Sequence, residues 1–216
     1  PTPIPTSSPT RLPTPHPTPK PTPNPTPKPI STPTTSPHQC GNALCELSEN
    51  AANCPIDCSS KEIETTYEFN LGSSGNMFVV KARRNIVVSS FAINSKSRGV
   101  GAVKIYTRAG SYTNHEQSRD GWELVYENDS VINNRRGVVT ELGFLDREIH
   151  IAKDRSQSFF VTSTNGLVYK GGEKEFSVYQ SDEGMEIMEG IGTEGEFEGM
   201  TYSPRVWSGI IRYEMQ

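Results

Sequence analysis

The chain of 216 residues carries 21 basic and 25 acidic residues, which give a formal net charge of −4. Its Lys and Arg residues do not cluster into the basic face that phosphate binding needs, so the composition argues against a nucleic-acid partner. No apolar run approaches the roughly 20 residues that a membrane-spanning helix needs, so no membrane span is expected.

The composition divides the chain into three segments, which we take as its domain organisation. Fifteen of the 17 prolines lie in residues 1–39, all four cysteines lie in residues 40–58, and residues 59–216 hold the aromatic residues. The last segment has 158 residues. That length is sufficient to bury one hydrophobic core, so we expect a single globular domain there.

Residues 13–29 have proline at every second position. Because proline fixes φ near −65° and lacks an amide donor, neither a helix nor a central strand suits this segment. The expected structure is a polyproline II arm, which at about 3.1 Å per residue extends residues 1–39 to roughly 120 Å. Such an arm is either a passive spacer or a docking element, which could also pair along the edge of a sheet.

The arm resembles the hydroxyproline-rich glycoproteins of algal walls and flagellar appendages. A twofold repeat on a threefold helix places threonine and proline on every side of the arm, so the resemblance implies sugars all around it. The implied attachment sites are Thr14, Thr18, Thr22 and Thr26 and, after hydroxylation, Pro15, Pro19, Pro23 and Pro27.

Four cysteines lie close together in the second segment, with none elsewhere in the chain. Cys40, Cys45, Cys54 and Cys58 follow a C-x4-C-x8-C-x3-C spacing, which fits zinc sites poorly. A local disulfide framework is expected instead, and it persists only in oxidising surroundings such as the extracellular space. Three pairings are open, of which we favour Cys40–Cys54 with Cys45–Cys58.

The cysteine segment is similar to a small module of secreted microbial and algal proteins with the pattern C-G-[ND]-G-x-C. Gly41, Asn42, Glu49 and Asp57 match this pattern, and Ala43 replaces a glycine. The oxygen-bearing side chains of Asn42, Glu49 and Asp57 are hard ligands that suit calcium, so a calcium ion is the one cofactor that we consider. The alternative is that these side chains cap turns and face water.

The third segment shows short alternating patterns, such as V-K-I-Y and E-I-H-I, and no convincing helical stripe. Many short strands at roughly ten-residue spacing are typical of an all-β sandwich or jelly roll. The expected strands are 67–71, 77–81, 86–93, 102–107, 122–126, 138–142, 148–152, 159–163, 168–169, 176–179, 185–188 and 206–213.

A resemblance to a known family covers about residues 67–214. It rests on GNMFVVKA, VKIYTRAGSY, SFFVTSTNG and MEIMEGIG, and above all on TYSPRVWSGIIRY. These stretches resemble an uncharacterised β-rich domain of secreted proteins from diatoms, other microalgae and some bacteria. This chain departs from the family pattern at Val79 and Ser208, where the family usually has Asp and Asn. The resemblance implies no enzymatic activity.

The glycine-rich stretch 190–195 spells G-x-G-x-x-G, but it does not predict a dinucleotide site. Such a site needs the motif to open a helix, whereas this one follows a predicted strand. Glu194 and Glu196 would also repel phosphate. We therefore expect no nucleotide here.

Residues that could carry catalysis are sparse. His16, His38, His115 and His150 are isolated, and no activated-nucleophile pattern is present. The run 182–198 holds seven carboxylates, and paired carboxylates serve glycoside hydrolysis. Acidic turns are more often only solvated, so a secreted hydrolase is the third hypothesis and no enzyme is expected.

Two further features concern the surface. Asn128-Asp129-Ser130 is the one N-x-[ST] sequon, and it falls in a predicted turn, where a glycan would be tolerated. Trp122 and Trp207 are either core residues or a ligand platform, and strand aromatics are more often core.

The leading hypothesis is an extracellular, glycosylated filament or matrix subunit without enzymatic activity. The arm of one copy would dock on the β domain of the next, and such head-to-tail contacts generate filaments. The main alternative is a carbohydrate-binding module on a Pro/Thr linker, which would need a row of exposed aromatics. Tyr106 and Tyr112 are the residues expected near enough to the surface to contribute to such a row.

Overall fold

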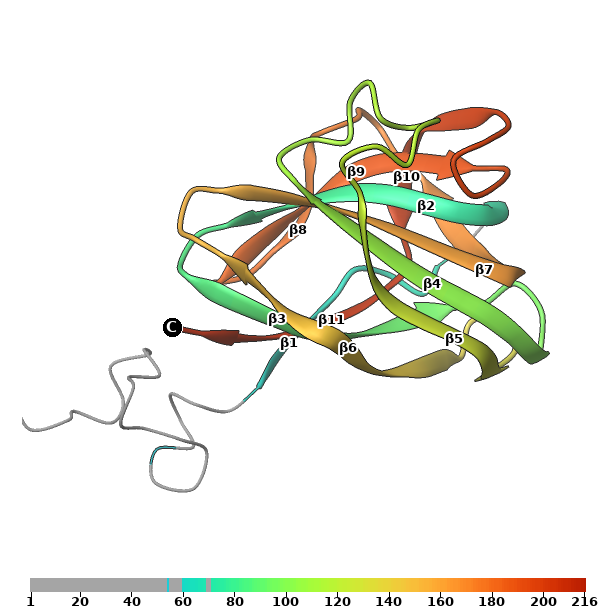
Figure 1. Ribbon diagram of the computed structural model, residues 1–216, viewed down its shortest axis with the longest axis horizontal. Helices are drawn as coiled ribbons and strands as arrows, with labels where there is room; N and C mark the ends of the chain where they lie inside the picture. The colour runs from blue at the N-terminus through green and yellow to red at the C-terminus, as the bar shows by residue number, and fades with distance from the viewer. Residues whose placement is uncertain (1–53, 55–59, 69–70) are drawn as a thin grey trace, which may run out of the picture. The chain divides into compact units, whose positions relative to one another are not determined.

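The computed structural model describes Cys54, residues 60–68 and residues 71–216, and these residues form antiparallel β-strands (Figure 1). None of them belongs to a helix, so this part of the chain holds no helix that could cross a membrane. The strands are β1 (Lys61–Glu64), β2 (Leu71–Ala82), β3 (Ile86–Asn94), β4 (Gly99–Ala109), β5 (Glu123–Asn133), β6 (Val139–Ile151), β7 (Ser156–Gly171), β8 (Val178–Ser181), β9 (Met185–Thr193), β10 (Thr201–Trp207) and β11 (Gly209–Met215).

The strands build two sheets that pack together. The four-stranded sheet has the order β1-β11-β3-β6. The seven-stranded sheet has the order β10-β9-β2-β7-β4-β5, with β8 added beside β9. Each recorded strand pair is antiparallel. The prediction of an all-β, sandwich-like fold is therefore confirmed for the described residues.

The main core lies between the two sheets. Side chains alternate across a strand, so every second residue of the inner strands points into this space. At its centre the Trp207 ring stacks on Phe78, with 4.6 Å between centroids, and meets Phe91 edge-on at 5.8 Å. Phe91 also contacts Phe159 at 5.1 Å. Trp207 is thus a core residue, as its strand pattern indicated.

A second core covers part of the outer face of the seven-stranded sheet. It contains the strand residues that alternate with those of the main core, so Phe160 lies here and its neighbour Phe159 lies between the sheets. The connection between β4 and β5 and the turn between β9 and β10 bring Trp122 and Phe197 over this face. Phe160 and Phe197 meet edge-on at 4.9 Å. Both sides of this sheet are therefore partly buried.

Several predicted strand boundaries are wrong. Tyr67 and Glu68, which begin the predicted strand 67–71, are not in a strand, whereas the unpredicted strand β1 ends at Glu64. Two long strands were each predicted as two short ones. The strand β6 corresponds to the predicted strands 138–142 and 148–152, and β7 corresponds to 159–163 and 168–169. Within β6 and β7, polar residues interrupt the apolar pattern but not the strand pairing. Register shifts in the β3–β6 and β2–β7 pairs accommodate these residues, so the hydrogen-bonded pairing resumes beyond them.

The predicted strand 206–213 divides in two at Ser208. This residue is buried, and its hydroxyl donates to the carbonyl of Thr66 while it accepts a 3.0 Å hydrogen bond from Asn94 Nδ2. The chain passes there from β10 in the seven-stranded sheet to β11 in the four-stranded sheet. The apolar pattern continues across the break because both halves face the main core.

Candidate functional site

The strand β7 changes partners part-way along its length, and this change creates a hollow. Residues 156–163 lie between β2 and β4. After a register shift, Tyr169 pairs with Leu71 of β2 on one side and with Trp207 of β10 on the other. Because β10 also pairs with β9, the sheet curls round at this end so that β9, β2, β7 and β10 enclose a short ring.

A pocket of about 320 Å³ opens at this curl, and we call it the Tyr–Arg pocket. It is built from the first residues of β2, the end of β7, the start of the β9–β10 turn and β10. Its lining residues are Leu71, Gly72, Ser73, Ser74, Tyr169, Glu194, Tyr202 and Arg205.

The guanidinium group of Arg205 is held between two tyrosine rings. Its Cζ lies 5.5 Å from the ring centroid of Tyr169 and 5.9 Å from that of Tyr202. Nη1 donates a 2.7 Å hydrogen bond to the carbonyl of Pro204, while the buried Nε has no hydrogen-bond partner among the described residues. Stacking on the faces of aromatic rings stabilises such a cation and fixes its orientation.

Glu194 supplies the acceptor side of the same pocket. Tyr202 Oη donates to its carboxylate, and the amide of Met200 donates to Oε2 at 3.2 Å. These hydrogen bonds lower the pKa of Glu194, with the tyrosine contributing most. The carboxylate of Glu194 is therefore ionised, although both of its hydrogen-bond donors are neutral groups. No Lys or Arg of the described residues forms an ion pair with it.

A second pocket of about 190 Å³ adjoins the first and shares Ser74 with it. We call it the hydroxyl pocket because hydroxyl side chains predominate in its lining. The residues are Ser74, Ala102, Lys104, Thr162, Ser163, Thr164 and Glu196. They come from β2, β4, β7 and the β9–β10 turn, so together the paired pockets run across the strands of the seven-stranded sheet.

Lys104 carries the positive charge of the hydroxyl pocket. Its Nζ lies 3.3 Å from Glu127 Oε1 and 3.4 Å from Glu196 Oε2. Burial alone would lower the pKa of Lys104, but the hydrogen bonds to these two carboxylates raise it. Glu196 also accepts a hydrogen bond from Tyr106 Oη. The paired pockets thus offer fixed cations, fixed carboxylates and hydroxyls, a set that suits the recognition of carbonyl and hydroxyl groups.

The tyrosines expected near the surface are buried instead. Tyr106 and Tyr112 are 1% and 0% exposed, and Trp122 is also buried. The reason is the β4–β5 connection, which folds over the sheet and is tied by a 3.0 Å hydrogen bond from Trp122 Nε1 to the carbonyl of His115. None of these three rings can serve as a flat platform for sugars. The expectation of a surface position was wrong for Tyr106 and Tyr112, whereas Trp122 is a core residue, the more common outcome for strand aromatics.

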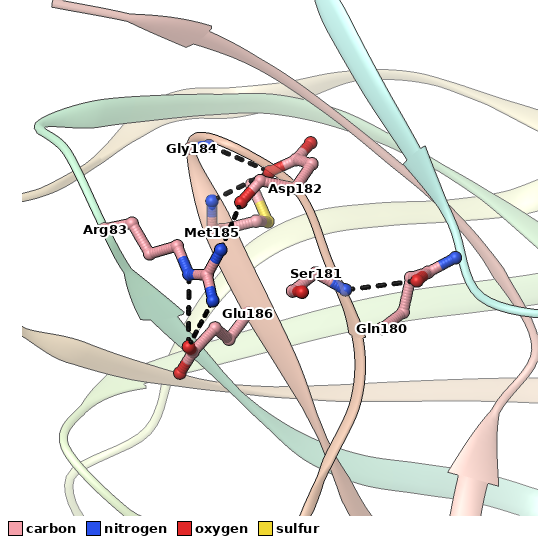
Figure 2. A network of polar contacts seen from close by, with 7 residues as sticks. All are labelled: Arg83, Gln180, Ser181, Asp182, Gly184, Met185 and Glu186. Atoms are coloured by element: carbon pink, nitrogen blue, oxygen red, sulfur yellow. Dashed lines mark hydrogen bonds and ion pairs between the residues drawn. The ribbon is translucent and has the colours of Figure 1, made fainter.

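The acidic run 182–198 is largely a set of hydrogen-bond acceptors that join strands and turns. Tyr213 Oη donates to Asp182 Oδ2 at 2.6 Å, and Glu189 accepts from the amides of Glu173 and Lys174 at 2.7 and 2.9 Å. In Figure 2, Asp182 closes the β8–β9 turn by accepting from the amides of Gly184 and Met185, while Arg83 reaches Glu186 on β9. Tyr112 similarly donates to Glu175, just outside the run, at 2.7 Å.

Paired carboxylate side chains do not line any of the four pockets described here. The Tyr–Arg pocket, the hydroxyl pocket and two further hollows on the surface each contain one carboxylate, from Glu194, Glu196, Glu183 and Glu116 respectively. The described residues also hold no group of three or more His, Cys, Asp or Glu side chains that could bind a metal.

The G-x-G-x-x-G stretch begins within a strand rather than in a turn. Gly190 and Gly192 belong to β9, between β2 and β10. A Cβ on Gly190 would lie 1.9 Å from the carbonyl oxygen of Met77, and one on Gly192 would lie 2.8 Å from the Tyr169 ring. These glycines therefore permit close packing of neighbouring strands and of the Tyr–Arg pocket wall.

The sequon 128–130 lies in β5 and not in a turn. Asn128, Asp129 and Ser130 are all exposed, and the β4–β5 register shifts beside them between Gly101 and Val103. An irregularity at a sheet edge resembles a turn in composition, because both expose polar residues.

Most of the predicted N-terminal sites lie outside the described residues. These are Cys40, Cys45, Cys58, the proposed calcium ligands Asn42, Glu49 and Asp57, and the arm positions Thr14, Thr18, Thr22, Thr26, Pro15, Pro19, Pro23 and Pro27. Cys54 is described, is buried and forms a disulfide. Its pairing with Cys40 stays a prediction.

Sequence reasoning did not find the Tyr–Arg pocket. Its residues come from positions 71–74, 169, 194, 202 and 205, which only the curl of the sheet brings together. No periodic signal marks them. The S-P-R motif at 203–205 was noted only as part of a resemblance, although it contains the arginine of the pocket.

No protein-family model matches this chain, and comparison with curated proteins finds no significant match. The resemblance to the β-rich domain of secreted microalgal and bacterial proteins therefore stays an expectation from the motifs alone.

Proposed function

We propose that this chain is a structural subunit of an extracellular, glycosylated filament or matrix, and that the arm 1–39 of one copy docks on the paired pockets of the next. The observation that carries the proposal is the Tyr–Arg pocket and the hydroxyl pocket beside it, which share Ser74 in their linings. Polyproline II segments bind to grooves of this kind, where prolines pack on aromatic rings and donor side chains reach backbone carbonyls.

The dimensions of the site and of the arm are compatible. The paired pockets span β4, β7, β2 and β10, which is about three or four strand spacings, or roughly 15–20 Å. Five or six residues in polyproline II cover this distance at about 3.1 Å each. The arm contains two octads of near-identical sequence, PTPHPTPK at 13–20 and PTPNPTPK at 21–28, and either one is long enough.

Charge also favours the arm as the ligand. Arg11, Lys20 and Lys28 give the arm three positive charges and no negative ones. Glu194 offers an ionised carboxylate without a cation partner among the described residues, and Arg205 offers donors for the carbonyls of the arm. A polyproline arm loses little conformational entropy on docking, because it is already extended.

Head-to-tail docking of this kind repeats without closing and therefore builds a filament. The disulfide knot 40–58 would separate the arm from the β domain, and an extracellular location would keep its cysteines oxidised. Calcium binding by Asn42, Glu49 and Asp57 and glycosylation of the arm belong to the same proposal.

The test compares assembly by the full chain with assembly by a chain that lacks residues 1–39. Electron microscopy and sedimentation should show polymers for the first and a folded, non-assembling domain for the second. Arg205→Ala should weaken assembly by removing the donor between the two tyrosines, whereas Arg84→Ala, at an exposed turn outside the paired pockets, should not. Normal polymers from the truncated chain would contradict the proposal.

A second candidate is carbohydrate binding at the Tyr–Arg pocket. The combination of a tyrosine ring, a guanidinium group and a carboxylate supports it, since the same groups bind sugar hydroxyls. If this candidate is right, the full chain stays dispersed at high concentration and is retained on a polysaccharide column, and Arg205→Ala abolishes the retention.

A further inference from the structure

The strand β5 forms one edge of the seven-stranded sheet. It runs for 11 residues and, among the strands that the structure describes, pairs with β4 alone. The other side of such an edge presents unpaired backbone amides and carbonyls, which can pair with the same edge of a second molecule. Proteins usually prevent this association with charges, bulges or a covering group.

An exposed apolar pair lies on the same two strands and increases the risk of association. Val100 of β4 and Ile132 of β5 are directly opposite one another, and they are 65% and 77% exposed. Neither residue lines the paired pockets, so the proposed docking of the arm does not cover them. Four positions separate Ile132 from Asn128, which corresponds to about 13 Å along the strand.

The side chain of Asn128 is arranged with its amide nitrogen free. Oδ1 accepts a 2.8 Å hydrogen bond from the backbone amide of Ser130, while Nδ2 has no hydrogen-bond partner among the described residues. Two other strand asparagines differ, because they are buried with Nδ2 engaged. Asn94 donates to Ser208 Oγ at 3.0 Å, and Asn133 donates to the carbonyl of Val131 at 3.0 Å.

We propose that Asn128 carries an N-linked glycan, and that this glycan blocks association through the edge of β5 and the Val100–Ile132 pair. The glycan comes from a lipid-pyrophosphate-linked oligosaccharide. Asn128 Nδ2 bonds to its anomeric carbon, the bond from that carbon to the pyrophosphate oxygen breaks with its electron pair, and one amide proton is released. A bulky, hydrated group at this position keeps a second sheet edge at a distance.

The inference rests on the extracellular location in the proposed function but not on docking of the arm. If the copies contact one another only through the arm, the edge of β5 must not pair with a strand of another copy. Filament formation and protection of β5 can therefore succeed or fail separately.

The experiment uses the full chain secreted from a eukaryotic host, with two matched variants of one residue. Ser130→Ala destroys the sequon and keeps Asn128 with its backbone partner, whereas Ser130→Thr preserves the sequon. Intact mass before and after treatment with a peptide N-glycosidase should show a glycan on the wild-type chain and on Ser130→Thr. An unmodified Asn128 in the secreted wild-type chain would overturn the proposal.

Sedimentation velocity then measures the protective effect. Ser130→Ala should self-associate more strongly than Ser130→Thr by about tenfold or more, equivalent to about 1.4 kcal/mol. Adding Ile132→Lys to Ser130→Ala should abolish the increase in self-association. This result would assign the increase to the β5 edge rather than to the arm. Equal association of Ser130→Ala and Ser130→Thr would overturn the protective role even if the glycan is present.

Discussion

Tyr213 Oη donates a 2.6 Å hydrogen bond to Oδ2 of Asp182, and this contact joins the two sheets. Tyr213 lies on β11 of the four-stranded sheet, and Asp182 begins the β8–β9 turn of the seven-stranded sheet. The turn is built around the tyrosine, because a Cβ on Gly184 would lie 2.5 Å from the Tyr213 ring. Gln180 of β8 adds a second link by donating to the carbonyl of Glu64 on β1 at 3.2 Å.

Removing the Tyr213 hydroxyl should destabilise the domain. In Tyr213→Phe the ring still packs, but a hydrogen bond to a charged acceptor is lost, which should lower the free energy of unfolding by about 1–2 kcal/mol. Denaturation with urea measures this change. Tyr202→Phe is the control, because it removes a hydroxyl from an exposed tyrosine–carboxylate pair and should leave stability nearly unchanged. Equal effects of the two variants would show that the link between sheets contributes nothing.

Alkaline pH should unfold the domain through its buried tyrosines. Burial is the first cause that raises the pKa values of Tyr67, Tyr106, Tyr112 and Tyr213, and nearby carboxylates add to it. The unfolded chain loses these protons near pH 10, whereas the folded chain keeps them. Stability from these groups is therefore complete below about pH 10 and falls as the pH rises further.

Ultraviolet absorbance of tyrosinate, followed together with circular dichroism, checks this pH dependence. Part of the tyrosine signal should appear only when the β-sheet signal is lost. Ionisation of every tyrosine near pH 10 in a still-folded domain would contradict the expectation. Tyr213→Phe should reduce the slope of stability against pH.

The glycine-rich stretch of β9 should tolerate no side chain at its first glycine. Gly190→Ala places a Cβ 1.9 Å from the carbonyl oxygen of Met77, so β2 and β9 must separate. We expect loss of folding or destabilisation by several kcal/mol, of the order found for overpacked cores. Gly143→Ala is the matched control, since the nearest atom to its Cβ is 3.9 Å away on Tyr126. Thermal unfolding of the two variants gives the comparison.

Glu189 should matter more for stability than its position in an acidic run indicates. Its carboxylate is buried and accepts hydrogen bonds from the amides of Glu173 and Lys174 at 2.7 and 2.9 Å. Glu189→Ala leaves both amides without an acceptor and should cost about 2–4 kcal/mol. Glu189→Gln keeps one oxygen and should cost less, and Glu198→Ala, at an exposed residue of the same run, should cost little. Chemical denaturation measures the free energy of unfolding of the three variants. A different order of their stability losses would contradict this role of Glu189.

The correct sequence predictions are those that depend on local pattern. Short apolar runs bounded by polar residues identified strands around 77–81 and 86–93, and alternation identified the strand around 102–107. The tendency of strand aromatics to be core residues placed Trp207 correctly. The boundaries that failed lie where pairing continues through polar residues, as in β6 and β7, or where the chain changes sheet without losing its apolar pattern, as at Ser208. The local pattern of apolar residues in a strand does not indicate which other strands pair with it.

The candidate site was not predictable for a related reason. Tyr106 and Glu196 are 90 positions apart, yet they share a hydrogen bond. Tyr106 alternates like any strand residue, so the sequence placed it near the surface. It is buried because the β4–β5 connection and the β9–β10 turn fold over it. The local pattern of β4 does not indicate that other segments cover the outer face of the seven-stranded sheet.

The amino-acid sequence by itself determined the all-β class, the division into a proline-rich, a cysteine-rich and a β-rich segment, and the residues that belong in a core. These properties follow from backbone restriction and from side-chain alternation, which act between near neighbours. Only the tertiary structure decided that Tyr169, Glu194, Tyr202 and Arg205 form one pocket and that the sequon lies on β5, the last strand of the seven-stranded sheet. Both depend on which strands pair and where the sheet curls, and such long-range packing is fixed by the fold as a whole.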